Sequence, residues 1–350
     1  MRARRLARSA LTERSTSPVE VARQVGGIHA QVQASAELQL AARVDEITQH
    51  DIHDALWRDR TLVKAWTLRG TLHLHPADEL PLWMATRSPQ KELPEWPDPE
   101  GVRHPAVSAE EAEELRAAVW EAAGAEPLLR EELADRVVLL AGKKHERRLR
   151  SGFAFFIGDL CHGPPRGNKI TLVRPDKWLG AWKRVSRDDA LREVLRRFLH
   201  AYGPARAADF RAWFGQEVPF ELVDVEEVDV EGHRAFVLAG DTQFPEPGKS
   251  VRLLPEYDVY VMGFRERDQL VPARVREQVA AHGRGRYEGP AGVRFVLADG
   301  ATAGLWERKK LAKRLEIRVA PAARVNHAAL KAEAARYAQF LGVELLLTVE

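Results

Sequence analysis

One short segment of the chain carries side chains suited to holding a water molecule. In Ile28–Ala34, with the sequence IHAQVQA, apolar and polar residues alternate strictly. Successive side chains of an extended backbone point to opposite faces, so His29, Gln31 and Gln33 would share one side. An imidazole and two carboxamides can orient a water molecule and accept its proton, but they supply no carboxylate. The pattern therefore suits hydrolysis of a bond whose leaving group is already cationic. A polar strand edge or a helix cap is the alternative.

The composition excludes several classes of protein. Of the 350 residues, 45% are hydrophobic and 30% are charged, which is typical of a globular chain rather than a disordered one. The formal net charge is only +2, so local basic patches would have to bind any anionic partner. The single cysteine, Cys161, excludes an intramolecular disulfide and a thiolate zinc cluster. We expect no metal and no cofactor.

The distribution of apolar residues indicates where the protein resides. No apolar run approaches the roughly 20 residues that a membrane-spanning helix needs. The N-terminal residues are basic but lack the continuous apolar core of a secretory signal. An arginine-rich targeting segment is the lesser alternative. We expect a cytoplasmic, nucleoid-associated protein without a membrane partner.

Helix and hairpin signals recur three times along the chain. Ser17-Pro18 with Glu20 is a capping-box start, and Gly26-Gly27 is a helix stop. Short helices followed by a tight hairpin are the pattern of a winged helix, and their recurrence predicts an internal repeat. The predicted helices are Arg4–Leu11, Val19–Val25, Ala34–Val44, Asp51–Arg58, Ala109–Ala123, Glu146–Leu160, Asp188–Tyr202 and Ala205–Phe214. The predicted hairpins are Leu62–Leu68 with Thr71–His75, Cys161–Val173, and Leu222–Val230 with Arg234–Leu238.

The sequence thus predicts an α+β protein of three tandem winged-helix modules with a small C-terminal β-barrel. The modules are expected at 1–87, 107–183 and 184–248, and the barrel at 249–350. Residues 88–106 are rich in proline, which blocks helices and central strands, and are expected to be a linker. The strands predicted in the barrel are Val251–Leu254, Val259–Gly263, Val293–Ala298, Ala303–Arg308 and Leu315–Val319, followed by a helix at Ala328–Leu341.

Basic residues gather around the third helix of the second module and around its wing. In helix-turn-helix folds this helix enters the DNA groove, and several phosphate contacts would make binding salt-dependent. A solvated helix face is the alternative. The third wing, residues 219–232, carries six acidic residues and no basic one, so we expect that module to be a scaffold. The predicted DNA contacts are Lys143, Lys144, Arg147, Arg148, Arg150, Arg166 and Lys169.

Three blocks of the sequence resemble the AlkZ/YcaQ-like winged-helix DNA glycosylases. They are Gly27–Gln31 with Arg43 downstream, Leu62–Leu74 ending in RGTLHL, and Leu253–Asp258 followed by Gly263–Arg267. The resemblance implies a C-shaped arrangement of three winged helices with a β-barrel. It also implies excision of alkylated purines from double-stranded DNA, including bulky natural-product adducts and interstrand crosslinks. Some members of the family protect antibiotic producers from their own DNA-alkylating product.

The resemblance also implies which residues act. The family's catalytic motif is glutamine–hydrophobic–glutamine or glutamine–hydrophobic–aspartate. By position it falls on His29-Ala30-Gln31, so a histidine replaces the first glutamine, and Gln33 offers a second match two residues later. Thr71 and His73 are possible catalytic support. Further predicted DNA contacts are Arg43, Arg69, Arg265 and Arg267.

The predicted function is that of a monofunctional DNA glycosylase that hydrolyses the N-glycosidic bond of N7-alkylated purines. His29 and Gln31 would position the water, and the protein would act as a monomer. Two alternatives are a non-catalytic winged-helix DNA-binding protein or transcriptional regulator, and an interaction scaffold that binds no DNA.

Overall fold

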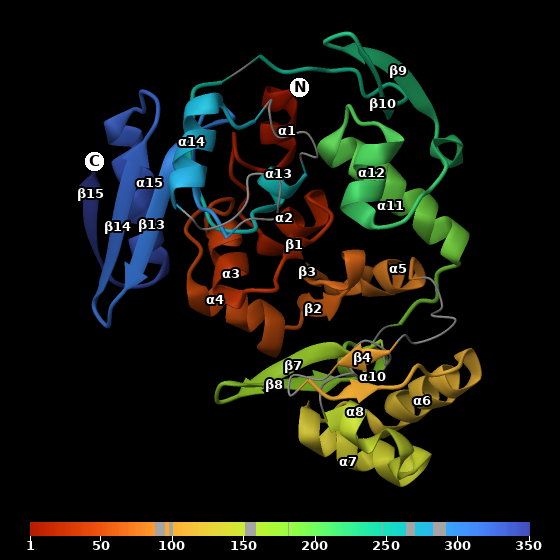
Figure 1. The fold of residues 1–350 in the computed structure, drawn as a ribbon. Coiled ribbons are helices and arrows are strands. Elements are labelled where there is room, and N and C mark those ends of the chain that lie inside the picture. Colours follow the sequence, from red (N-terminus) through yellow and green to blue (C-terminus); the bar gives the residue numbers. More distant parts are fainter. Residues whose placement is uncertain are drawn as a thin grey trace. The chain divides into compact units, whose positions relative to one another are not determined.

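The computed structural model describes residues 1–87, 95–97, 101–150, 159–180, 182–246, 248–263, 270–282 and 292–350. The chain forms two compact units that do not follow chain order (Figure 1). The first unit contains Met1–Asp54, His73–Pro76 and Leu191–Glu350, and the second contains Ala55–Leu72 and Ala77–Ala190. The segment around His29 therefore folds together with the C-terminal part of the chain. Within the described ranges, no helix is long and apolar enough to cross a membrane.

Four short helices form the N-terminal part of the first unit: α1 (Arg2–Arg8), α2 (Pro18–Gln24), α3 (Gln33–Ala41) and α4 (Gln49–His53). The predicted start of α2 is confirmed, because the Ser17 side chain accepts a hydrogen bond from the Glu20 N–H at 3.3 Å. The predicted stop is also confirmed. Gly26 and Gly27 follow α2 with φ values of 69° and 106°, in the left-handed region that favours glycine.

The extended segment after these glycines is shorter than predicted. Strand β1 covers only Ile28–His29 and pairs antiparallel with β3 (Leu72–Pro76). Gln33 already belongs to α3, so the extended conformation considered for Ile28–Ala34 ends at His29. The alternating pattern was compatible with a longer strand, but only residues 30–32 separate the ladder with β3 from the first residue of α3. His29, Gln31 and Gln33 therefore do not project from one strand.

A five-stranded sheet dominates the C-terminal part of the first unit. Its order is β11 (Val251–Leu254), β12 (Phe295–Ala298), β13 (Ala301–Lys310), β14 (Arg314–Pro321) and β15 (Glu344–Val349). All neighbouring pairs are antiparallel except β14 and β15, which run parallel. This curled sheet confirms the predicted β-rich tail. Helix α15 (His327–Phe340) packs against β11, β14 and β15 and against α3, so the sheet is joined to the N-terminal helices (Figure 1).

Three elements of this region differ from the prediction. Val259–Gly263 was expected to be a strand, but Val259–Met262 is the short helix α13. The Asp258 side chain caps it by accepting a hydrogen bond from the Tyr260 N–H at 2.9 Å, and this cap outweighs the strand propensity of valine and tyrosine. Helix α14 (Ala273–His282), which contacts β13, and strand β15 were not predicted.

The remaining elements of the first unit form a helix pair and a hairpin. Helices α11 (Arg187–Tyr202) and α12 (Ala207–Phe214) pack through aromatic rings, among them Phe198 and Trp213, whose centroids are 5.1 Å apart. Strands β9 (Val225–Val230) and β10 (His233–Leu238) pair antiparallel, as predicted for the third hairpin. Ala205 pairs with Phe236 of the hairpin, and Arg5 of α1 donates a hydrogen bond to the Pro204 carbonyl at 3.0 Å.

The second unit holds the strands β2 (Leu62–Trp66), β7 (Cys161–Arg166), β8 (Lys169–Val173) and β6 (Leu128–Leu129) and has its own hydrophobic core. Strand β2 pairs with β7, which pairs with β8, and β8 pairs with β6. The hairpin β7–β8 confirms the prediction for Cys161–Val173. The other elements are η1 (Asp54–Arg58), η2 (Leu68–Gly70), η3 (Ala77–Glu79), α5 (Leu80–Ala85), α6 (Ala109–Ala122), α7 (Arg130–Ala141), η4 (Lys143–His145), α8 (Glu146–Arg150) and α10 (Pro175–Trp178).

The helices of the second unit match the predicted ranges in part. Ser108 caps α6 by accepting a hydrogen bond from the Glu111 N–H at 3.2 Å. Leu115, Val119, Leu133 and Val137 from α6 and α7 form the core beside Leu172. Helix α8 covers only the beginning of the predicted Glu146–Leu160, and residues 151–158 lie outside the described part. In the proline-rich stretch, β4 (Trp96–Pro97) pairs with β5 (Arg103–His104).

Candidate active site

His29 lies in a cluster of histidine rings, which we call the histidine cluster: His29, His73 and His75. The register of β1 and β3 places His29 opposite His73, and their ring centroids are 5.3 Å apart at an interplanar angle of 85°. The ring of His75 is 5.9 Å from that of His73. All three side chains are buried, with His29 being 6% exposed. Although polar residues at alternate positions of a strand often face solvent, His73 and His75 are 2% and 0% exposed.

Close packing of Gly27 on His75 fixes the start of β1. A Cβ atom at Gly27 would lie 2.9 Å from Nδ1 of His75 and closer still to Cε1. The residue must therefore be glycine both for space and for its φ of 106°. Burial, with a smaller contribution from the Arg197 charge, lowers the pKa of His75 to about 3. His75 is thus a neutral packing partner at physiological pH.

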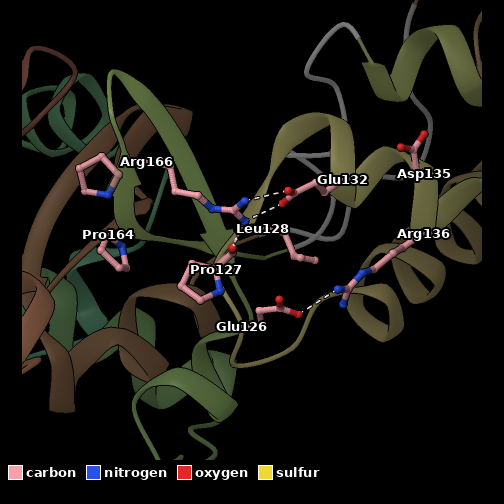
Figure 2. Close-up of a pocket in the computed structure, with 9 residues that line it drawn as sticks. Glu126, Pro127, Leu128, Glu132, Asp135, Arg136, Pro164 and Arg166 are labelled. Atoms are coloured by element: carbon pink, nitrogen blue, oxygen red, sulfur yellow. Dashed lines mark hydrogen bonds and ion pairs between the residues drawn. The ribbon is translucent and has the colours of Figure 1, made fainter.

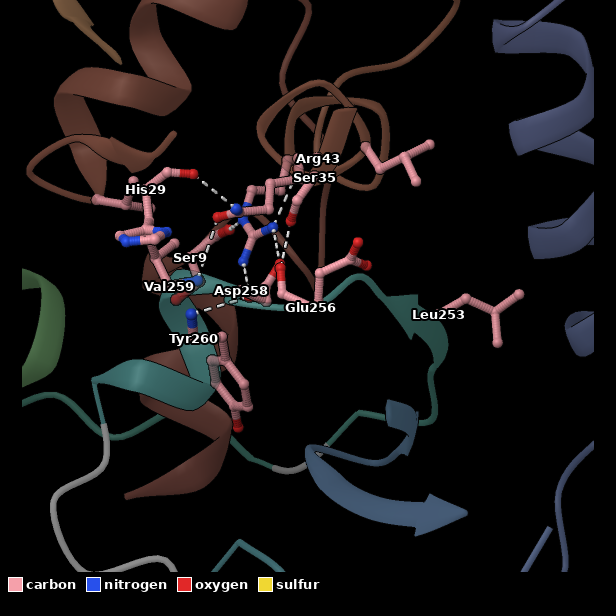
Figure 3. Close-up of polar contacts among 12 residues, drawn as sticks. Ser9, His29, Ser35, Arg43, Leu253, Glu256, Asp258, Val259 and Tyr260 are labelled. Carbon is pink, nitrogen blue, oxygen red and sulfur yellow. Dashed lines mark hydrogen bonds and ion pairs between the residues drawn. The ribbon is translucent and has the colours of Figure 1, made fainter. Parts of the chain in front are cut away.

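Gln39 connects the backbone of His29 to the C-terminal part of the unit. Its Nε2 donates a hydrogen bond to the His29 carbonyl at 3.0 Å, and its Oε1 accepts one from the Val259 N–H at 3.2 Å. The side chain is fully buried. Figure 3 shows the two segments facing each other across these polar contacts. The carboxamide therefore ties β1 to the first residue of α13.

Arg43 and Asp258 form a buried ion pair one step further from His29. Nη1 and Nη2 of Arg43 contact the two carboxylate oxygens of Asp258 at 2.8 and 2.7 Å, and both side chains are 0% exposed (Figure 3). Arg43 also donates to the carbonyls of Ser9 and Gln39, each at 3.0 Å. Burial alone would lower the pKa of Arg43, but the Asp258 carboxylate outweighs it and raises the pKa.

This position corrects one predicted DNA contact. A guanidinium with no exposed surface cannot meet a phosphate, so in this structure Arg43 is a structural residue. Its bonds hold the end of α3 to Ser9 and to the cap of α13.

Tyr257 lies beside the imidazole of His29. Their ring centroids are 5.4 Å apart and tilted by 38°. On one side of Tyr257, Glu256 accepts hydrogen bonds from Arg294 at 2.7 and 3.1 Å and receives the Ser35 hydroxyl at its carbonyl oxygen. On its other side is Asp258, bound to Arg43. Three residues in a row thus connect α3 and β1 to the C-terminal sheet.

The two glutamines predicted to act with His29 lie in different surroundings. Gln31 is exposed, whereas His29, two residues earlier, is buried. Gln33 is half-buried and donates a hydrogen bond to Oε1 of Glu37 at 3.1 Å. Glu37, 3% exposed, also accepts from Gln49 at 2.6 Å and from His53 at 3.0 Å. Gln33 is thus part of a polar contact between α3 and α4.

This arrangement has clear chemical capabilities. A neutral imidazole can accept a proton, and an exposed carboxamide nearby in sequence can hold a water molecule or a polar group. Among the residues that the structure describes, no group of three or more histidine, cysteine, aspartate or glutamate side chains has a geometry suited to a metal ion. The site presents hydrogen-bonding groups rather than a carboxylate nucleophile.

Other predicted site residues lie in the second unit. Arg69 is exposed at the turn between β2 and β3 and has a φ of 53°. Thr71 is half-buried, and its hydroxyl donates to the Leu68 carbonyl at 3.0 Å, which closes the turn. Arg265 and Arg267 lie outside the described residues. DNA binding by Arg69 and catalytic support by Thr71 stay predictions.

The basic residues of α8 and η4 fall into three groups. Lys143 and Arg147 are exposed. Lys144 and Arg150 form ion pairs, the first with Glu111 and the second with Asp135 at 2.6 Å and with Glu146 at 2.9 Å. Arg148 is buried and donates to the Pro105 carbonyl. Burial corrects the prediction for Arg148, whose guanidinium anchors the backbone before α6. DNA binding by the others stays a prediction.

The hairpin β7–β8 of this unit borders a surface pocket. Its volume is about 680 Å³, and its lining includes prolines from β7 and acidic residues from α7 (Figure 2). Arg166 forms a bidentate contact with Glu132 at 2.7 and 2.6 Å, and these hydrogen bonds lower the pKa of Glu132. Lys169 lies 3.7 Å from Glu131. A phosphate would have to compete with these carboxylates.

Comparison with known proteins connects the geometry to a family. A family model described as DNA glycosylase AlkZ-like matches residues 22–340. The chain belongs to this family. It is 33% identical over 319 residues to an interstrand DNA cross-link repair glycosylase of Streptomyces sahachiroi, covering 83% of this chain and 82% of the relative. The solved structure of Streptomyces sahachiroi DNA glycosylase AlkZ matches with a TM-score of 0.81 at 30% identity, covering 100% of this chain and 98% of that one.

Membership of the AlkZ-like family confirms the resemblance drawn from the three sequence blocks. The chain is thus a DNA glycosylase by family, a hydrolase that acts on N-glycosyl bonds. The non-catalytic regulator and the scaffold are set aside. Sequence reasoning missed two residues of the site. Tyr257 lay within a quoted block but was not singled out, and nothing in the local pattern pointed to Gln39.

Proposed function

We propose that this AlkZ-like glycosylase hydrolyses the N-glycosidic bond of N7-alkylated purines in double-stranded DNA by a water that His29 and Gln31 position. Bulky natural-product adducts and interstrand crosslinks belong to the proposed substrates, since the Streptomyces sahachiroi relative is named an interstrand cross-link repair glycosylase. One observation carries the proposal: an imidazole anchored by a strand pair and a buried carboxamide lies two residues from an exposed glutamine.

Hydrolysis of an N7-alkylated nucleotide needs little catalytic assistance, because the leaving group is already activated. Alkylation at N7 puts positive charge on the purine, so the base leaves as a neutral molecule. The transition state resembles an oxocarbenium ion at the sugar, as in other glycoside hydrolyses. An enzyme gains most by holding the water at C1′ in the correct orientation. Uncharged hydrogen-bonding groups suffice for this step.

His29 and Gln31 divide the work in this proposal. The Gln31 carboxamide is exposed and so is accessible to the DNA backbone and to a water molecule. The His29 ring packs against His73 and Tyr257, which restricts its orientation. In this proposal the oriented imidazole accepts the proton of that water. Gln33 is engaged by Glu37 and serves the shape of α3 instead.

The rest of the chain would hold the duplex. We propose that the three helix–hairpin modules are winged helices and that the first two contact DNA. Lys143 and Arg147 support this because they are exposed on η4 and α8. The third hairpin carries Glu226, Glu227 and Asp229 on its exposed positions, which would repel phosphates. It is proposed as a scaffold.

The test is excision of N7-alkylguanine from duplex DNA, with abasic sites cleaved by hot alkali. Single-turnover rates would be measured for the wild type and for the His29→Ala, Gln31→Ala and Gln33→Ala variants. We expect losses of about 10²–10⁴-fold for His29→Ala, the range for a general base, and a smaller effect for Gln33→Ala. His50→Ala is the matched control, since His50 is an exposed histidine of the same unit.

The pH dependence separates two roles of His29. If it takes the proton, the excision rate should fall below about pH 6.5, the ordinary histidine value. A rate that is flat from about pH 5 to pH 8 would leave His29 as a positioning group. Full activity of both His29→Ala and Gln31→Ala would refute the proposed site.

A further inference from the structure

We infer that Tyr257 is a positioning residue of the excision reaction, which sets the orientation of the His29 imidazole from a backbone held in the left-handed region. The inference rests on the proposed function of His29. Tyr257 comes from the turn between β11 and α13, more than two hundred residues after β1. Its ring nevertheless lies 5.4 Å from that of His29, centroid to centroid.

The backbone of Tyr257 is unusual. Its φ is 60°, a region that bulky residues rarely adopt, and such conformations persist only when the surroundings enforce them. The surroundings here do so from both sides. Glu256 is tied through its carboxylate to Arg294 and through its carbonyl to the Ser35 hydroxyl. Asp258 is tied to Arg43 and caps α13.

The consequence of this conformation is the direction of the ring. The left-handed turn at Tyr257 presents its half-buried ring to His29 while Glu256 and Asp258 keep their own partners. His73 meets the same imidazole edge-on at 85°. The His29 ring is thus confined by two aromatic neighbours, one on β3 and one on the Glu256–Asp258 turn. A proton acceptor must hold its orientation to gain from a bound water, because misplacement by about 1 Å costs about 10²-fold in rate.

The residue type at position 257 also indicates that Tyr257 does more than fill space. A strained residue that served only to fill space could be replaced by glycine or asparagine, which adopt positive φ with little cost. Here a large aromatic side chain stands at that position, and it is only partly buried. Its contact with His29 is what asparagine could not provide. This difference makes the inference testable without disturbing the turn.

The experiment compares Tyr257→Phe, which keeps the ring, with Tyr257→Asn, which keeps the tolerance for positive φ but removes the ring. Single-turnover excision of N7-alkylguanine from duplex DNA gives the maximal rate and the half-saturating enzyme concentration separately. We expect Tyr257→Phe to stay within about 3-fold of wild type. Tyr257→Asn should lower the maximal rate about 10- to 100-fold with little change in half-saturation. The control is Tyr260→Phe, which removes a hydroxyl bound to the Gly300 carbonyl at 2.8 Å and should leave the excision rate unchanged.

A double-variant cycle with His29→Ala decides whether Tyr257 acts through His29. In that background, Tyr257→Asn should cause no further loss. A further loss of the full size, an equal loss in Tyr257→Phe, or a change confined to half-saturation would each overturn the inference. If Tyr257→Asn melts far below wild type, Tyr257→Gly takes its place in the cycle, since glycine has no strain at this φ. A wild type that releases no base would instead count against the proposed function.

Discussion

Replacing Asp258 by asparagine leaves the guanidinium of Arg43 buried without its counter-charge. Both side chains are 0% exposed and share two hydrogen bonds of 2.7 and 2.8 Å. Removing one partner of such a pair costs about 3–5 kcal/mol, because the remaining charge cannot be solvated. Asp258 also caps α13, and asparagine retains most of that capping ability. The loss should therefore come from the ion pair.

The expected loss in the free energy of unfolding can be converted into a shift of the melting temperature. About 2–4 °C is lost per kcal/mol in a unit of roughly 150–250 residues, so Asp258→Asn should melt about 6–20 °C below wild type. Circular dichroism during heating would measure this. The matched control is Asp45→Asn. Asp45 is 51% exposed and lies 2.9 Å from Arg336, so its loss should cost at most about 1 kcal/mol.

Two results would refute the reasoning. One is an Asp258→Asn variant that melts no lower than Asp45→Asn. The other concerns the double variant Arg43→Met/Asp258→Asn. If burial of an uncompensated charge is the cause, this double variant should be less unstable than the sum of its two single variants predicts. Simple additivity would mean that the two residues stabilise the unit independently.

Three further outcomes are expected. Gly27→Ala should destabilise the first unit and lower the excision rate, because its Cβ would strike the His75 ring at a φ of 106°; heating curves and the abasic-site assay check this. Burial lowers the folded-state pKa of His75 and of His162 to about 3. The unfolded chain therefore binds protons first as the pH falls, and the free energy of unfolding should fall below about pH 6.5. In urea titrations, the difference in the free energy of unfolding between pH 7 and pH 5 should be smaller for His162→Phe than for the wild type. Lys143→Glu with Arg147→Glu should weaken duplex binding and flatten its salt dependence in fluorescence anisotropy, whereas Glu226→Gln with Glu227→Gln should not.

Local signals in the sequence predicted most of the elements. Caps such as Ser17 and Ser108 give helix starts because the capping bond forms within four residues. The turn glycines of α2 and the hairpin at Cys161–Val173 follow the same logic. These features depend on neighbours in the chain, so no distant contact was needed to find them.

The predictions that failed depended on distant parts of the chain. Val259–Met262 has the composition of a strand, but the segment is helical where Asp258 caps it and Gln39 accepts from Val259. Arg43 was predicted to contact a DNA phosphate because it is a charged residue. Its actual partner, Asp258, lies 215 residues away in the sequence and could not be found from local patterns. Gln39 and Tyr257 could not be found for the same reason. Their roles arise when α3 and the Glu256–Asp258 turn come together.

On the proposed assignment, His29 takes the place of the family's first catalytic glutamine, and the exchange has a physical reason. A glutamine is uncharged at every pH, and the position is nearly closed to solvent, which penalises a charged side chain. A neutral imidazole therefore preserves the uncharged character that a motif of two carboxamides has, and it adds a better proton acceptor. Under the proposed function, a neutral imidazole at this position places no positive charge next to the cationic purine until it takes the proton of the water.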